Sequence, residues 1–313
     1  MVPLSFWVGF HAALLVFLGL DLGVFHRKPQ AIGIRAAAVW SVVWILLALA
    51  FNAGVYFYMG PSRGLEFLTG YLIERALSID NIFVFVVVFS FFDVPAAFQH
   101  RVLFWGIVGA LVLRGALIAA GAALLDRFHW VTLLFGAFIL ITGVRFFFHR
   151  PEKMDVGRNP ALRLVRRLLP VTEGYEAGAF VLRRTGRWIA TPLLFVLVVV
   201  ESVDLAFALD SIPAIFAVTH SAFIVYTSNV FAILGLRASY FLLAALVPRL
   251  RYLSVGLAVV LVFIGVKMLA EPWVAISTGA SLCAVVLVVA IAVGASLLAP
   301  APVRTAGGSG DLR

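Results

Sequence analysis

The chain has 313 residues, of which 63% are hydrophobic and only 12% are charged, with a mean hydropathy of +1.09. This excludes a soluble globular domain, in which about 45–50% of residues are apolar and about 25% are charged. The net charge of +9 would suggest nucleic acid as the partner of a soluble protein. The apolar runs, of about 20 residues each, instead indicate a helical polytopic membrane protein whose partner is the lipid bilayer, with no role for nucleic acid.

Nine apolar segments follow one another along the chain, each long enough to cross a bilayer. They are Ser5–Phe25, Ala36–Tyr58, Leu65–Phe92, Val102–Leu125, Trp130–Phe148, Thr191–Thr219, Ala222–Val247, Tyr252–Leu269 and Val274–Leu298. The first has no basic residue before it, so we expect a span rather than a cleavable signal peptide. The sequence therefore predicts an all-α protein of about nine transmembrane helices. Its single cysteine, Cys283, excludes an intrachain disulfide.

The basic residues predict the orientation in the membrane. They concentrate in alternate connections: after the first, fifth and seventh spans, and after the ninth. Cytoplasmic loops carry the excess of lysine and arginine in membrane proteins. We therefore expect a protein of the cell (inner) membrane with its N-terminus outside, and with its C-terminus and the basic 149–190 stretch in the cytoplasm.

Two of the spans carry matching acidic motifs. Glu74, Asp80 and Asn81 in the third span have the spacing of Asp204, Asp210 and Ser211 in the sixth. The following spans match as well, with Arg114 against Arg237 and Gly143-Val144-Arg145 against Gly265-Val266-Lys267. Spans three to five and six to eight therefore predict two copies of a three-helix unit. Because each copy has an odd number of spans, the second is inverted in the membrane, as in many secondary transporters.

This repeat predicts the organisation of the chain. Residues 1–64 form two N-terminal helices, 65–148 the first three-helix repeat and 149–190 a cytoplasmic basic loop. Residues 191–270 form the second repeat, 271–299 the last transmembrane helix and 300–313 a disordered cytoplasmic tail.

The buried acids are the candidate site. A carboxylate at mid-membrane costs about 2.5–3.5 kcal/mol on insertion scales, so it needs a partner. At about 100° per residue, Glu74 and Asn81 share one helix face, as do Asp204 and Ser211. Pro213 cannot donate to the carbonyl of Leu209, which predicts a helix break beside Asp210. Acid-rich oxygen sites suit Mg²⁺, Ca²⁺ or Mn²⁺. An alternative is that the acids pair with Arg114 and Arg237 and lock the helices together; we expect these arginines to balance some acids while the others bind a cation or protons.

Enzyme motifs are absent from the apolar segments, which contain no HExxH, no GxGD and no phosphate-binding glycine loop. We therefore expect a transporter rather than an enzyme, without a tightly bound cofactor.

Five segments of the chain resemble a known family. GLEFLTGYLIERALSIDNIFVFVVVFSFFDVP and VVVESVDLAFALDSIPAIFAVT are similar to the two signature segments of the TerC family of integral membrane proteins. FLGLDLGVFHRK, RVLFWGIVGALVLRG and FGAFILITGVRF resemble the same family.

The resemblance implies a plan like that of the lysine-exporter superfamily and a link to tellurite resistance or, for some members, manganese export. It implies that the metal path consists of Asp21, Glu74, Asp80, Asn81, Glu201, Asp204 and Asp210. The expected function is secondary export of a divalent metal ion, with Mn²⁺ favoured, in exchange for protons. The alternatives are a non-transporting membrane scaffold in stress response or membrane-protein biogenesis, and an exporter of Ca²⁺ or an amino acid. The sequence leaves the oligomeric state open.

The orientation can be tested with a reporter fused at Gly308. We expect a reporter that is active only in the cytoplasm to work there, because the last connection and the tail carry the positive-inside signal. Activity of a reporter that works only outside the membrane would contradict the predicted orientation.

Overall fold

The computed structural model of the protein describes residues 2–25, 34–128, 130–148, 167, 170–172, 174–184, 186–243, 252–270, 273–274 and 276–298. The helices are α1 (Leu4–Phe25), α2 (Ile34–Met59), α3 (Pro61–Phe91), α4 (Ala96–Arg127), α5 (Trp130–Phe148), α7 (Pro192–Phe216), α8 (Ala222–Leu234), α9 (Leu236–Leu243), α10 (Leu253–Ala270) and α11 (Thr278–Leu298). Between α5 and α7 lie a short 3₁₀ helix, η3 (Glu176–Gly178), and two strands, β1 (Val181–Arg184) and β2 (Arg187–Ala190).

The predicted all-α membrane protein is confirmed. Over the described ranges, α2, α4, α7, α10 and α11 are long and apolar enough to cross a membrane, and α1, α5 and α8 contain shorter apolar helices. Helix α3 is 31 residues long but carries five charged residues, which lowers its hydropathy. The number of nine spans stays a prediction.

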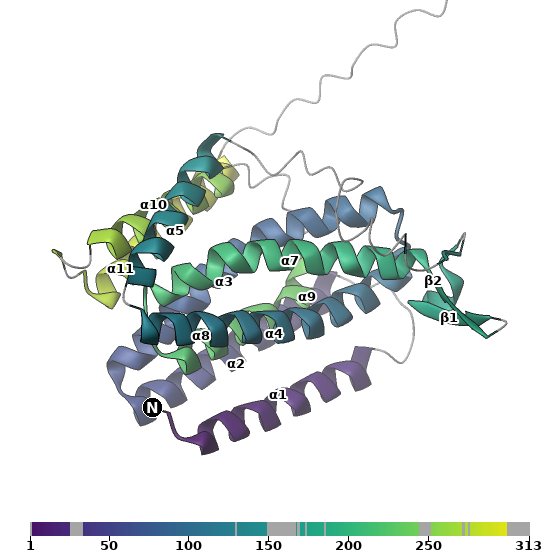
Figure 1. Ribbon diagram of the computed structural model, residues 1–313, viewed down its shortest axis with the longest axis horizontal. Coiled ribbons are helices and arrows are strands. Elements are labelled where there is room, and N and C mark those ends of the chain that lie inside the picture. The colour runs from purple at the N-terminus through teal and green to yellow at the C-terminus, as the bar shows by residue number, and fades with distance from the viewer. Residues whose placement is uncertain are drawn as a thin grey trace, which may run out of the picture.

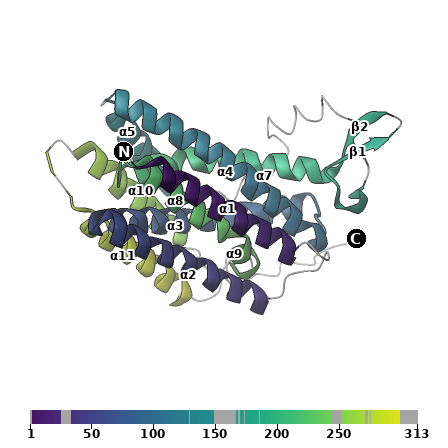
Figure 2. The same ribbon diagram turned by 90° about the horizontal axis from the view of Figure 1, so that it is seen from below.

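The long helices form one bundle (Figure 1). Helices α3 and α4 each pack against both α7 and α8, and these four surround the centre of the molecule. Helices α5, α10 and α11 lie together at one end, inclined to the long axis, while β1 and β2 lie at the opposite end in both views (Figures 1 and 2). The hydrophobic core follows the same helices, with Phe67, Ile118, Ile215 and Ile224 fully buried in it.

Two predictions about helix continuity are wrong. Helix α7 does not break at Pro213 but continues to Phe216, because the Pro213 carbonyl still accepts a hydrogen bond from Ala217 N at 3.1 Å. The predicted continuous span Ala222–Val247 instead divides at Gly235 into α8 and α9, and its residues from 244 onward lie outside the described ones. A Cβ at Gly235 would lie 3.0 Å from Arg75 Nη1, so the Arg75 side chain packs closely against this glycine.

The β1–β2 hairpin was not expected within the basic 149–190 stretch, of which residues 149–166 lie outside the described residues. Tyr175 Oη donates to the carbonyl of Phe92 just after α3, and Arg101 Nη1 donates to the Gly178 carbonyl at 2.8 Å. Thr191, which caps α7, donates to the Ala179 carbonyl at 2.6 Å. The hairpin region therefore ties the end of α3 to the beginnings of α4 and α7.

Tyr175 remains a donor in this contact. Burial raises the pKa of Tyr175 above its ordinary value, and the Asp93 carboxylate adds to the rise. The phenol therefore keeps its proton for the bond to the Phe92 carbonyl over a wide pH range.

The opposite ends of α3 and α7 are also tied. Arg63 Nη1 lies 2.6 Å from Glu66 Oε2 and donates to Thr219 Oγ1 at 3.2 Å, while Thr219 donates to Glu66 at 2.5 Å. The beginning of α3 therefore meets the end of α7, and the two helices run in opposite directions.

Two glycines allow α5 and α10 to cross closely. A Cβ added at Gly143 would lie 2.8 Å from Val262 N, and one added at Gly265 would lie 2.7 Å from Leu140 N. Real Cβ atoms do not approach so near, so the two backbones are in contact. Such small-residue crossings replace the hydrophobic effect as the basis of helix packing within a membrane.

Alanine at either glycine should separate these helices. We expect Gly143→Ala and Gly265→Ala each to lower the free energy of unfolding, because overpacking costs about 1–3 kcal/mol. The matched control is Gly294→Ala in α11, where nothing lies within 4 Å of the added Cβ and the helix gains up to about 1 kcal/mol. Thermal unfolding in detergent measures all three, and equal shifts would contradict the close crossing.

Candidate functional site

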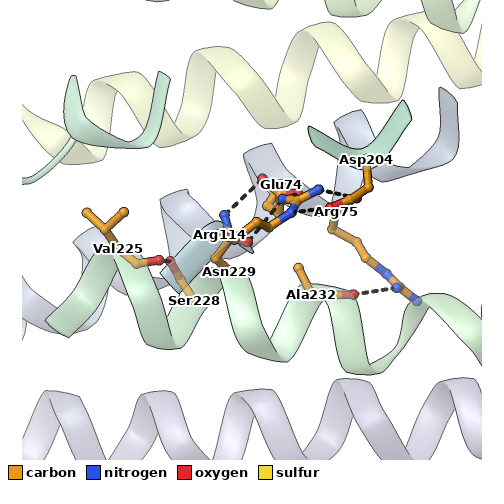
Figure 3. Close-up of polar contacts among 8 residues, drawn as sticks. All are labelled: Glu74, Arg75, Arg114, Asp204, Val225, Ser228, Asn229 and Ala232. Atoms are coloured by element: carbon orange, nitrogen blue, oxygen red, sulfur yellow. Dashed lines mark hydrogen bonds and ion pairs between the residues drawn. The ribbon is translucent and has the colours of Figure 1, made fainter. Parts of the chain in front are cut away.

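The centre of the bundle is held by Arg114 of α4, whose side chain is only 2% exposed. Its Nε and Nη2 donate to the two oxygens of Asp204 in α7, at 3.1 and 2.8 Å. This two-point contact is the strong geometry for a guanidinium and a carboxylate. Arg114 and Asp204 therefore form a buried ion pair that joins α4 to α7 (Figure 3).

Two further side chains complete this network. Arg114 Nη1 donates to Glu74 Oε1 in α3 and to Asn229 Oδ1 in α8, the latter at 3.0 Å. Asn229 Nδ2 in turn donates to the other Glu74 oxygen at 3.2 Å. We call Glu74, Arg114, Asp204 and Asn229 the four-residue network; all four side chains are buried, and each comes from a different helix (Figure 3).

The network leaves one negative charge. With Arg114 charged and both acids ionised, two carboxylates face one guanidinium. Removal of one member of a buried ion pair costs about 3–5 kcal/mol, because the remaining charge is uncompensated. Arg114 therefore stabilises the bundle. It forms ion pairs with Glu74 and Asp204, as the alternative in which an arginine balances the acids expects.

A small cavity lies beside the network. Its volume is about 20 Å³, and its polar lining is Glu74, Asn81, Asp210 and Ser211. A space of about 10–15 Å³ or more can hold one water molecule. We call it the polar cavity. The cavity lies between α3 and α7, and its four polar residues all belong to the two matching acidic motifs.

Two oxygen atoms of the polar cavity have no hydrogen-bond partner among the described residues. Asn81 Oδ1 and Ser211 Oγ are buried and accept or donate no hydrogen bond within the described part of the chain. Each such atom costs about 1–3 kcal/mol when left unsatisfied, so a partner inside the cavity is expected. Asp210 Oδ1 is 3.4 Å from Thr142 Oγ1 in α5, which leaves its carboxylate largely available to the cavity.

The other predicted acids lie apart or are not described. Glu201, one turn before Asp204, lies in the space left by the missing side chain of Gly109, and its Oε2 has no partner among the described residues. Asp21, Asp80 and Arg237 lie in α1, α3 and α9, but their side chains fall outside the described ones. Among described residues, no group of three or more His, Cys, Asp or Glu side chains could hold a metal ion.

Sequence reasoning missed Asn229 and Thr142. Asn229 was recognisable as an amide in the apolar segment AFIVYTSNVFAIL, because polar side chains in membrane helices usually bond to a neighbouring helix. Nothing in the sequence set Thr142 apart from other helical threonines.

Arg75 bonds to the end of α8 and to α9, outside the four-residue network. Its Nη1 donates to the Ala232 carbonyl at 3.2 Å, and its Nη2 donates to Ser239 Oγ. Figure 3 shows it directed toward Ala232. A cation at the C-terminal end of α8 is favourable, because the last carbonyls of a helix carry partial negative charge. Arg75 therefore stabilises the break between α8 and α9.

Comparisons with known proteins match most of the chain. Residues 59–302 match the family described as integral membrane protein TerC family. An uncharacterized membrane protein of Myxococcus xanthus, STKORF319, is 51% identical over 293 residues, which cover 94% of this chain and 91% of the relative. The putative membrane-bound redox modulator Alx of Escherichia coli strain K12 is 47% identical, covering 84% of this chain and 85% of Alx. An uncharacterized membrane protein of Rickettsia bellii is 37% identical, covering 93% and 97%. No solved structure matches the chain.

Replacement of the central arginine tests the network. We expect Arg114→Met to lower the free energy of unfolding by about 3–5 kcal/mol, because Glu74 and Asp204 lose their cation. Thermal unfolding in detergent measures the effect. The control is Arg63→Met, whose ion pair with Glu66 has a 42% exposed arginine side chain and contributes about 0–1 kcal/mol. Similar losses for the two variants would show that the buried network is not central to stability.

Proposed function

The chain belongs to the TerC family of integral membrane proteins, and on this premise we propose that it is a secondary transporter that exports a divalent metal ion, Mn²⁺ being the favoured substrate. The observation that carries the proposal is the polar cavity. It is lined by the acids Glu74 and Asp210, and by Asn81 and Ser211, whose side-chain oxygens have no partner in the part of the chain that the structure describes.

The chemistry of this cavity fits a hard cation. Carboxylate, amide and hydroxyl oxygens suit Mg²⁺, Ca²⁺ and Mn²⁺, whereas thiolates favour Cu⁺ and Zn²⁺. The single cysteine, Cys283, is exposed on α11, a helix that contributes no residue to the polar cavity. The cavity's size allows one small ion that has lost its water shell at least in part.

The helix arrangement is compatible with an inverted repeat. In such a repeat α3 corresponds to α7, α4 to α8 and α5 to α10. The contact between α3 and α8 then corresponds to the contact between α7 and α4, and both contacts are present. The glycine contacts are exchanged as well, since Gly143 lies against Val262 and Gly265 against Leu140. We propose that the two repeats meet at the polar cavity, where transporters of this plan bind their substrates.

The remaining acids would complete a path across the membrane. Asp80 lies next to Asn81 in the chain, and Glu201 lies two turns before the cavity on α7 toward the hairpin end. We propose that Asp21, Asp80 and Glu201 carry the ion or an exchanged proton, with the hairpin end facing the cytoplasm. A carboxylate can release its metal ion when it takes up a proton, which couples the two fluxes.

A non-transporting scaffold is the second candidate. The Alx relatives are named putative membrane-bound redox modulators. A single cysteine allows no exchange between an intrachain dithiol and disulfide here, so redox modulation of that kind would need a second protein. The docked β1–β2 hairpin, with Trp188 57% exposed, would then be the working surface.

Cellular manganese content separates the candidates. We expect cells with the wild-type protein to hold less manganese than cells without it. Asp210→Asn and Asp80→Asn should abolish this difference, because Asp210 lines the cavity and Asp80 is proposed to carry the ion along its path. Elemental analysis of cells grown with added manganese measures it.

Asp126→Asn is the control, because Asp126 is an exposed acid at the end of α4. It should lower cell manganese like the wild type. Normal export by well-folded Asp210→Asn and Asp80→Asn would contradict the proposed site. Loss of the manganese difference only on deletion of residues 181–190, the β1–β2 hairpin, would favour the scaffold.

A further inference from the structure

Glu74 belongs both to the four-residue network and to the polar cavity. One of its oxygens accepts a hydrogen bond from Arg114, the other accepts one from Asn229, and the same residue lines the cavity with Asp210. A cation that enters the cavity and binds Glu74 therefore meets a carboxylate that already has a guanidinium. The ion and Arg114 compete for one ligand.

We propose that Arg114 is the specificity-determining residue of this transporter, an internal cation that holds Glu74 when the cavity is empty and that only a divalent ion displaces. The inference rests on the proposed function, since it concerns the same site. It assigns to Arg114 a task beyond the balancing of charge: the rejection of monovalent cations.

The rejection follows from charge. Coulomb attraction scales with the product of the charges, so at equal distance a divalent ion attracts Glu74 twice as strongly as a monovalent one. K⁺ or Na⁺ would replace one unit charge by another and lose the directed hydrogen bond of the guanidinium. With Glu74, Asp204 and Asp210 ionised and Arg114 charged, the site carries a net charge of −2, which one divalent ion neutralises.

The geometry lets Arg114 release Glu74 and remain in place. Its Nε and Nη2 both bond to Asp204, which does not line the polar cavity, and only Nη1 reaches Glu74. Asn229 Oδ1 accepts from the same Nη1 at 3.0 Å and would keep that donor satisfied. The guanidinium is therefore held by Asp204 through two hydrogen bonds, while its contact with Glu74 can be replaced.

The test is Mn²⁺ binding to the purified full-length protein in detergent, measured by isothermal titration calorimetry. Each titration is run in KCl and in choline chloride at equal ionic strength, so that screening is the same and only K⁺ is small enough to enter. The main variant is the double substitution Arg114→Gln with Asp204→Asn, which keeps the net charge of the site and a hydrogen-bonding pair. Its matched control is Arg63→Gln with Glu66→Gln, the partly exposed ion pair at the beginning of α3.

Wild type and control should bind Mn²⁺ with the same affinity in both salts. In choline chloride the Arg114→Gln, Asp204→Asn variant should bind Mn²⁺ about tenfold more tightly than the wild type, because no cation has to leave Glu74. In KCl its affinity for Mn²⁺ should be about tenfold lower than in choline chloride, because K⁺ can then occupy the site. Arg114→Lys keeps the charge but lacks the fork, so it should bind Mn²⁺ more tightly than wild type and still exclude K⁺.

Two results would overturn the inference alone. One is a folded double variant that binds Mn²⁺ like the wild type in both salts. The other, decisive even if the double variant does not fold, is an Arg114→Lys protein with wild-type affinity or with sensitivity to K⁺. If the wild type binds neither Mn²⁺ nor Ca²⁺, the proposed function fails together with this inference.

Discussion

The rest of this structure depends on one buried guanidinium. Within an apolar bundle, a carboxylate without a cation is too costly to keep ionised. Arg114 meets this constraint for two acids at once, and in doing so it fixes the relative positions of α3, α4, α7 and α8. The polar cavity lies directly against this network because Glu74 belongs to both. The element that holds the fold together and the element that would bind substrate therefore share a side chain.

Much of this arrangement could be predicted from the sequence. Composition alone indicates the membrane, and the matched acid pairs indicate α3 and α7 as the helices that carry the site. The face shared by Glu74 and Asn81 follows from helical periodicity, and both residues line one cavity. Local spacing is sufficient here because it decides which side chains on one helix lie together.

Contacts between helices could not be predicted in the same way. Asp204 and Asp210 are the same residue type on the same helix, yet the first pairs with Arg114 and the second lies at the cavity. That choice depends on the rotation of α7 against α4, which the spacing of residues on a single helix does not determine. Gly235 and Pro213 show the same limit: proline is tolerated in the last turn of α7, and the break occurs at a glycine that faces Arg75. A break depends on what packs against the residue as well as on the residue itself.

The polar contacts at the two ends of α3 and α7 differ in their chemistry. At one end, an arginine whose side chain is 42% exposed joins Glu66 and Thr219. At the other, the contacts of Tyr175, Arg101 and Thr191 all end on main-chain carbonyls. Salt weakens an exposed ion pair but acts far less on a hydrogen bond to a carbonyl. The ionic strength of the medium on one side of the membrane would therefore loosen the bundle at one end only, which makes the molecule mechanically asymmetric.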